Sequence, residues 1–170
     1  MPEEIVMVTP DKSFVDLVAE YGGEGVKMCF QCGTCTASCP SGRNTAYRTR
    51  KTMRAAQMGF RDIAFSGDDL WQCTTCYTCQ ERCPRDVPIV DVVVAMRNIA
   101  VAEGKMYDPH RKTGQNLVEI GHSVSFGDKQ KKMRADMGLD EVPPTVLANK
   151  KAMDDLKKIL AATGFDKLVG

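Results

Sequence analysis

Two short stretches of the sequence contain all eight of its cysteines. They read CFQCGTCTASCP and CTTCYTCQERCP, and they place cysteines at positions 29, 32, 35 and 39 and at positions 73, 76, 79 and 83. In both runs the offsets are 0, 3, 6 and 10, and a proline follows the last cysteine. Soft thiolate ligands suit iron–sulfur clusters, and the doubled C-x2-C-x2-C-x3-C-P spacing is typical of chains that bind two [4Fe–4S] clusters.

The last cysteine of each run is expected to point away from its own loop, because a residue before proline is held in an extended conformation. In the two-cluster pattern of bacterial ferredoxins this fourth cysteine ligates the other cluster. We therefore predict that the two runs exchange their last ligands. The first cluster would be held by Cys29, Cys32, Cys35 and Cys83, and the second by Cys73, Cys76, Cys79 and Cys39.

Structural zinc and disulfides are the alternative uses of so many cysteines. Zinc takes four ligands, usually from two C-x-x-C knuckles, so the additional cysteine in each run would be superfluous. Disulfides are rare in the cytoplasm, and the acidic start MPEEIVMVTPDKS lacks the basic and apolar pattern of a secretory signal. Both alternatives are therefore disfavoured, and a cytoplasmic location is expected.

The overall charge excludes some partners. Lys and Arg number 23 against 22 Asp and Glu, so nothing draws the whole chain towards nucleic acid or an anionic membrane. The most apolar run, residues 87–102, contains Asp91 and Arg97. A membrane-spanning helix needs about 20 mostly apolar residues, so no span is expected.

Helical periodicity predicts an all-α fold. Between the cysteine runs, residues 41–72 are expected to be largely helical, with breaks at Gly59 and at Ser66-Gly67. Further helices are expected over residues 14–21, 89–103, 109–120 and 149–162, whereas residues 129–140 stay undecided. Asp11 or Ser13 can cap the earliest of these helices, and Gly22 and Gly104 can end the first two.

No residue pattern indicates a catalytic site on this chain. His110 and His122 lie far from both cysteine runs and are expected at the surface or at a helix end. The aromatic residues Phe30, Trp71 and Tyr77 flank the runs and either keep water from the clusters or pack around the loops.

A basic cluster fills much of the segment between the runs. It either faces an acidic partner and balances cluster charge, or forms an ordinary solvated helix face. Its members are Arg43, Arg48, Arg50, Lys51, Arg54 and Arg61.

The two cysteine runs, with WQCTTCYTCQERCPRDVPIVD around the second, resemble the iron–sulfur C subunit of the CoB–CoM heterodisulfide reductase of methanogenic archaea, within the α-helical ferredoxin group. The resemblance is strong over residues 25–105. It implies a helical extension at residues 1–24, a di-cluster domain at 25–105, and a helical, partner-docking extension at 106–170. Succinate dehydrogenase and fumarate reductase subunits of the same group carry an additional upstream cysteine set for a [2Fe–2S] cluster, which this sequence lacks.

The resemblance implies an electron relay in methanogenesis. The flavin-containing A subunit of such a complex would supply electrons, and the B subunit would use them to reduce the CoM-S-S-CoB heterodisulfide. An associated hydrogenase or formate dehydrogenase would feed the complex, which would couple this reduction to ferredoxin reduction by electron bifurcation. Two alternatives stay open: a free-standing diffusible ferredoxin, and a relay subunit of a succinate/fumarate or glycolate-type oxidoreductase.

Overall fold

The computed structural model describes residues 9–170, and every regular element within this range is helical. The chain divides into two compact units, up to Lys105 and from Met106 onwards. No helix of the described part is long and apolar enough to cross a bilayer. The elements of the first unit are α1 (Lys12–Val18), η1 (Ala19–Gly23), η2 (Glu24–Met28), α2 (Thr34–Ser38), α3 (Pro40–Asn44), α4 (Thr49–Met58), α5 (Arg61–Phe65), η3 (Asp68–Gln72), α6 (Thr78–Glu81) and α7 (Ile89–Ala102).

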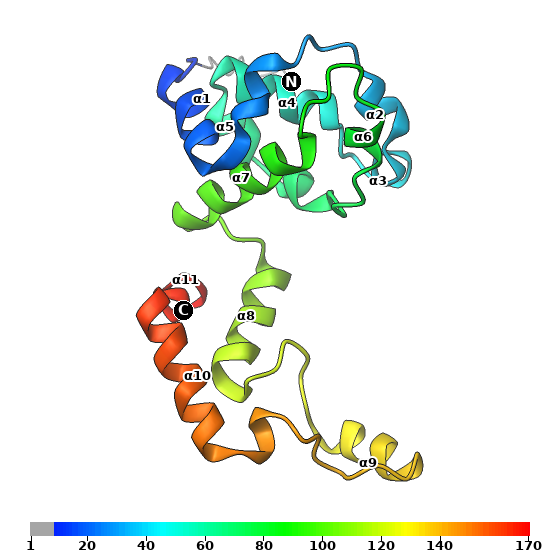
Figure 1. Cartoon of the computed structure of the whole chain (residues 1–170), viewed down its shortest axis with the longest axis vertical. Helices are drawn as coiled ribbons and strands as arrows, with labels where there is room; N and C mark the ends of the chain where they lie inside the picture. The colour runs from blue at the N-terminus through cyan, green and yellow to red at the C-terminus, as the bar shows by residue number, and fades with distance from the viewer. Residues whose placement is uncertain (1–8) are drawn as a thin grey trace, which may run out of the picture. The chain divides into compact units, whose positions relative to one another are not determined.

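The core of the first unit forms around α7, the most apolar helix of the unit. Val92, Val93 and Met96 on this helix are fully buried, as are Phe14 and Val18 on α1. Figure 1 shows α7, in green, running beside the blue N-terminal helices that cover it. Because the N-terminal segment contributes buried side chains, it belongs to the same core as the cysteine runs.

Local signals explain the first and last helices of this unit. The Asp11 side chain accepts a hydrogen bond from the Ser13 amide at 2.9 Å and so caps α1. After α1 the backbone reverses at Gly22, whose φ is +94°. Gly104, with φ +76°, follows α7 in the same left-handed conformation.

The segment between the cysteine runs is largely helical, as the sequence predicts, but it is divided more finely than expected. It forms four short elements, α3, α4, α5 and η3, of which only α4 exceeds five residues. The chain leaves the helical conformation between α3 and α4, where Arg48 Nη1 donates to the carbonyls of Gly42, Thr45 and Tyr47, each at 2.8 Å. The expected breaks at Gly59 and at Ser66-Gly67 do separate the later elements.

The second unit contains α8 (Asp108–Ile120), α9 (Asp128–Asp136), η4 (Val146–Ala148), α10 (Lys150–Thr163) and α11 (Phe165–Val169). Asn149 caps α10 through its side chain, 3.1 Å from the Ala152 amide. The apolar side of α10 packs partly within this unit, since Leu160 is buried, whereas Ile159 is 60% exposed. His122 shares a hydrogen bond of 2.6 Å with Thr145, and His110 lies exposed on α8.

Candidate iron–sulfur centre

The two cysteine runs adopt the same backbone conformation. Gln31 and Thr75, which occupy equivalent positions, have φ values of +64° and +52°. Two residues later, Gly33 and Tyr77 have φ values of +89° and +61°. Left-handed conformations are costly for residues other than glycine and concentrate at functional sites. Each loop is therefore bent in the same way, and the short helices that follow, α2 and α6, pack against each other.

The eight thiols are divided between two small cavities. One cavity is lined by three cysteines of the first run and one of the second, namely Cys29, Cys32, Cys35 and Cys83. The other is lined by Cys39, Cys73, Cys76 and Cys79. Each cavity thus receives the last cysteine of the opposite run.

The thiols of each cavity surround a space rather than a single point. One zinc ion needs its sulfur ligands within about 2.3 Å of the metal, and no group of three or more Cys, His, Asp or Glu side chains in residues 9–170 converges in this way. A [4Fe–4S] cube is larger, and each of its thiolates binds a different iron atom. The four-sulfur donor set that lines each cavity therefore suits such a cube.

Hydrogen-bond donors surround the sulfur atoms in both loops. The Gly42 amide donates to Cys39 Sγ and the Val87 amide donates to Cys83 Sγ, both at 3.4 Å. Gln31 Nε2 lies 3.6 Å from Cys29 Sγ. Such donors stabilise the negative charge of an iron–sulfur cluster.

Hydrogen bonds and burial shift the pKa values of four of the thiols in opposite directions. Hydrogen bonds with Thr34 lower the pKa of the exposed Cys32, and hydrogen bonds with Thr78 lower the pKa of Cys76 at the equivalent position. Burial raises the pKa of Cys35, and burial together with neighbouring thiols raises the pKa of Cys79 to about 12. A positively charged metal would lower the pKa values of these inner thiols and favour their thiolate form.

Side chains from α4 and α7 hold the two loops in place. Gln57 on α4 donates to the carbonyls of Val26 and Cys29 at 2.9 and 2.6 Å, next to the first loop. On α7, Arg97 Nη2 donates to the carbonyls of Leu70 and Cys73 at 2.9 and 2.6 Å. These contacts connect each loop to a helix of the core.

The flanking aromatic residues have different surroundings. Trp71 lies against Arg97, whose guanidinium carbon is 5.5 Å from the ring centroid. Phe30 is 58% exposed, so it does not shield a cavity from water as one of the two sequence interpretations supposes. Tyr77 lines the second cavity but is 47% exposed.

The sequence does not predict two further residues that line the second cavity. Tyr47 and Thr49 are each 1% exposed, and both line the cavity beside Cys39 and Cys73. The one sequence signal is an aromatic and a β-branched residue inside an otherwise basic segment.

Comparisons with known proteins agree with this geometry. Residues 25–87 match the family model described as a 4Fe-4S dicluster domain. The C subunit of the "H(2):CoB-CoM heterodisulfide,ferredoxin reductase" of Methanothermobacter marburgensis is 48% identical over 160 residues, covering 94% of this chain and 86% of the relative.

Two other relatives have a similar degree of identity. The iron–sulfur C subunit of the CoB–CoM heterodisulfide reductase of Methanopyrus kandleri is 50% identical, covering 85% of this chain and 76% of the relative. The C subunit of the "Ferredoxin:CoB-CoM heterodisulfide reductase" of Methanosarcina mazei is 45% identical, covering 89% of this chain and 93% of the relative. Identity of this extent, together with the paired cysteine loops, shows that the chain belongs to the family of the iron–sulfur C subunits of CoB–CoM heterodisulfide reductase, which are electron-transfer subunits of an oxidoreductase.

Proposed function

We propose that the chain carries two [4Fe–4S] clusters and passes single electrons between other subunits of a heterodisulfide reductase. Cys29, Cys32, Cys35 and Cys83 would hold the first cluster, and Cys39, Cys73, Cys76 and Cys79 the second. The observation that carries this proposal is the division of eight thiols into two cavities of four, each lined by both loops. When bound, such clusters accept and release one electron at a time.

The protein residues have a limited task in this relay. The loop amides and side-chain donors balance the negative charge of thiolate-bound iron, and the helices of the first unit keep the loops in fixed positions. None of these residues takes up a substrate, so the chemistry on the disulfide belongs to another subunit. The cysteines act as ligands and not as nucleophiles.

The partners in this proposal are the flavin-containing A subunit, which supplies electrons, and the B subunit, which reduces the CoM-S-S-CoB heterodisulfide in methanogenesis. The names of two relatives pair heterodisulfide with ferredoxin and with hydrogen or formate as donors. These names support an electron-bifurcating complex with an associated hydrogenase or formate dehydrogenase, which we propose to be cytoplasmic.

Anaerobic purification from the native organism tests the proposal. We expect about eight irons and eight sulfides per chain, and two interacting S = ½ signals in the EPR spectrum of the reduced protein. The chain is expected to elute with at least two other subunits rather than alone at 18.7 kDa. Elution as a lone ferredoxin would contradict the relay in a fixed complex, and an iron content of about four would contradict the two clusters.

A further inference from the structure

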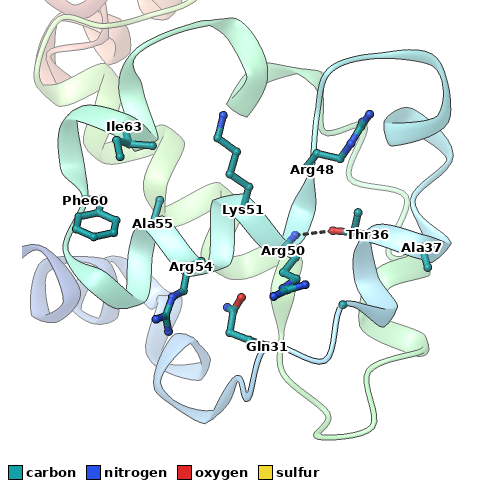
Figure 2. Close-up of a pocket in the computed structure, with 11 residues that line it drawn as sticks. Gln31, Thr36, Ala37, Arg48, Arg50, Lys51, Arg54, Ala55, Phe60 and Ile63 are labelled. Atoms are coloured by element: carbon teal, nitrogen blue, oxygen red, sulfur yellow. Dashed lines mark hydrogen bonds between the residues drawn. The ribbon is translucent and has the colours of Figure 1, made fainter. Parts of the chain in front are cut away.

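A groove of about 930 Å³ lies on the first unit, beside the first cysteine loop (Figure 2). Its cationic side chains come from α4 and the residue before it, and are Arg48, Arg50, Lys51 and Arg54. Its apolar side chains are Ala37, Ala55, Phe60 and Ile63. We call this surface the basic groove. It combines positive charge with apolar contact area, as protein interfaces do.

The four cations are not equivalent. Arg48 is engaged with three backbone carbonyls, and Lys51 lies 3.9 Å from the carboxylate of Asp69. The side chains of Arg50 and Arg54 make no hydrogen bond or ion pair with any residue in the range 9–170, and both are exposed. In the view of Figure 2 these two side chains lie on either side of Gln31. Two guanidinium groups are therefore available to an external anion.

The groove is continuous with one of the two cysteine cavities. Gln31, Gly33 and Arg50 line both the groove and the cavity of Cys29, Cys32, Cys35 and Cys83. A molecule that fills the groove would thus lie directly beside the first cluster. Since electron transfer slows steeply with distance, this is a favourable place for a redox partner.

We propose that the basic groove receives an acidic segment of the partner protein that exchanges electrons with the cluster of Cys29, Cys32, Cys35 and Cys83. The proposal rests on the proposed relay function and adds the position and charge of one docking site. Carboxylates of the segment pair with Arg50 and Arg54, and apolar side chains cover Phe60 and Ile63. Complementary charge of this kind speeds association and orients the partners.

Reversing the charge of Arg54 tests the docking site. Arg54 lines the groove but not the cysteine cavity, so Arg54→Glu is expected to retain full iron content. We expect its Kd for the partner subunits to rise about tenfold or more at low salt, and the difference to shrink at high salt, where charges are screened. Lys12→Glu on α1 is the matched control: it changes the same charge at an exposed site of the same unit, and its Kd should stay at the wild-type value.

An unchanged Kd for Arg54→Glu with full iron content would overturn the groove proposal and leave the relay function standing. If that variant loses iron, Arg54→Gln replaces it, and a smaller increase in Kd is expected. A photo-crosslinking residue in place of Ile63 identifies the occupant. We expect crosslinks to an acid-rich segment of one partner protein; binding of a small organic anion without any protein crosslink would also overturn the proposal.

A second, independent observation concerns the other cavity. The hydroxyl groups of Tyr47 and Thr49 are buried and have no hydrogen-bond partner among the described residues. Both residues line the cavity of Cys39, Cys73, Cys76 and Cys79, and Tyr47 lies next to Thr49 and Cys73.

A buried hydroxyl without a partner is costly and requires an explanation. We infer that Tyr47 and Thr49 donate hydrogen bonds to sulfur atoms of the cluster held in this cavity. Reduction adds one electron and therefore one negative charge to the cluster, and the donors stabilise that charge. They therefore raise the reduction potential of the second cluster.

Removal of each hydroxyl measures its effect. Tyr47→Phe and Thr49→Val keep the side-chain volume nearly constant, and both are expected to shift the potential of one EPR signal to a lower value while the other signal stays unchanged. Tyr21→Phe, at a residue that is 44% exposed, is the matched control and should shift neither potential. Unchanged potentials in both Tyr47→Phe and Thr49→Val, at full iron content, would overturn the inference.

Discussion

Replacing Cys83 with alanine is expected to remove the cluster of the opposite loop. In the proposed ligand set Cys83 is the fourth ligand of the cluster that Cys29, Cys32 and Cys35 hold, and it lines their cavity. The variant should therefore retain about four of the eight irons. The retained cluster is expected to be the second one, whose proposed ligands are Cys39, Cys73, Cys76 and Cys79.

Matched variants identify which cluster is lost. Cys83→Ala and Cys29→Ala should abolish the same EPR signal, whereas Cys39→Ala and Cys73→Ala should abolish the other. If instead Cys83→Ala and Cys73→Ala remove the same signal, each run holds its own cluster and the exchange of ligands is wrong. Cys83→Ser, which leaves a weaker oxygen ligand, should show the same selectivity with a smaller loss of iron.

Gly59→Ala is expected to be the most destabilising small substitution in the first unit. Gly59 ends α4 with φ +69°, and a Cβ atom there would lie only 2.1 Å from the backbone oxygen of Asp11. The Asp11 amide also donates to the Gly59 carbonyl at 2.8 Å, so neither backbone segment can move without cost. The left-handed conformation costs about 1–2 kcal/mol for alanine, and the steric overlap adds about 1–3 kcal/mol.

Gly104→Ala separates these two contributions. Gly104 has a similar φ of +76°, but no atom lies within 4 Å of a Cβ placed there. We expect Gly104→Ala to lower the melting temperature by about 5 °C and Gly59→Ala by at least about twice as much, followed by circular dichroism under argon. Equal melting temperatures for the two variants would show that the α1–α4 contact has no energetic weight.

Local sequence signals were sufficient for the helices that carry their own start and stop residues. Asp11 caps α1, Asn149 caps α10, and Gly104 follows the end of α7, whereas Gly22 lies inside η1 and interrupts the helical conformation there. Within residues 41–72, the break between α3 and α4 was harder to predict because it coincides with contacts between a side chain and the nearby backbone, and not with a glycine or proline. There, Arg48 donates hydrogen bonds to three backbone carbonyls, an arrangement that the periodicity of the sequence does not indicate.

The candidate site, too, could be predicted only in part from the sequence. The cysteine spacing alone points to the cofactor, and the family model that matches residues 25–87 agrees with a 4Fe-4S protein. The basic cluster, by contrast, has no single role. Arg48 supports the backbone, Arg61 pairs with Asp11 and Glu103, and only Arg50 and Arg54 of the groove make no hydrogen bond or ion pair within the described residues. Equal charges in a sequence acquire different functions because their neighbours in space differ.

The mixed lining of the two cavities has a consequence for biosynthesis. A ribosome releases Cys35 roughly 50 residues before Cys83, which corresponds to about 2–10 s of translation. During this interval the emerging first run offers Cys29, Cys32, Cys35 and Cys39, but the first cavity still lacks Cys83. Iron delivered to the nascent chain would therefore find an incomplete ligand set. Both clusters are expected to assemble only after the second loop has left the ribosome, and at nearly the same time.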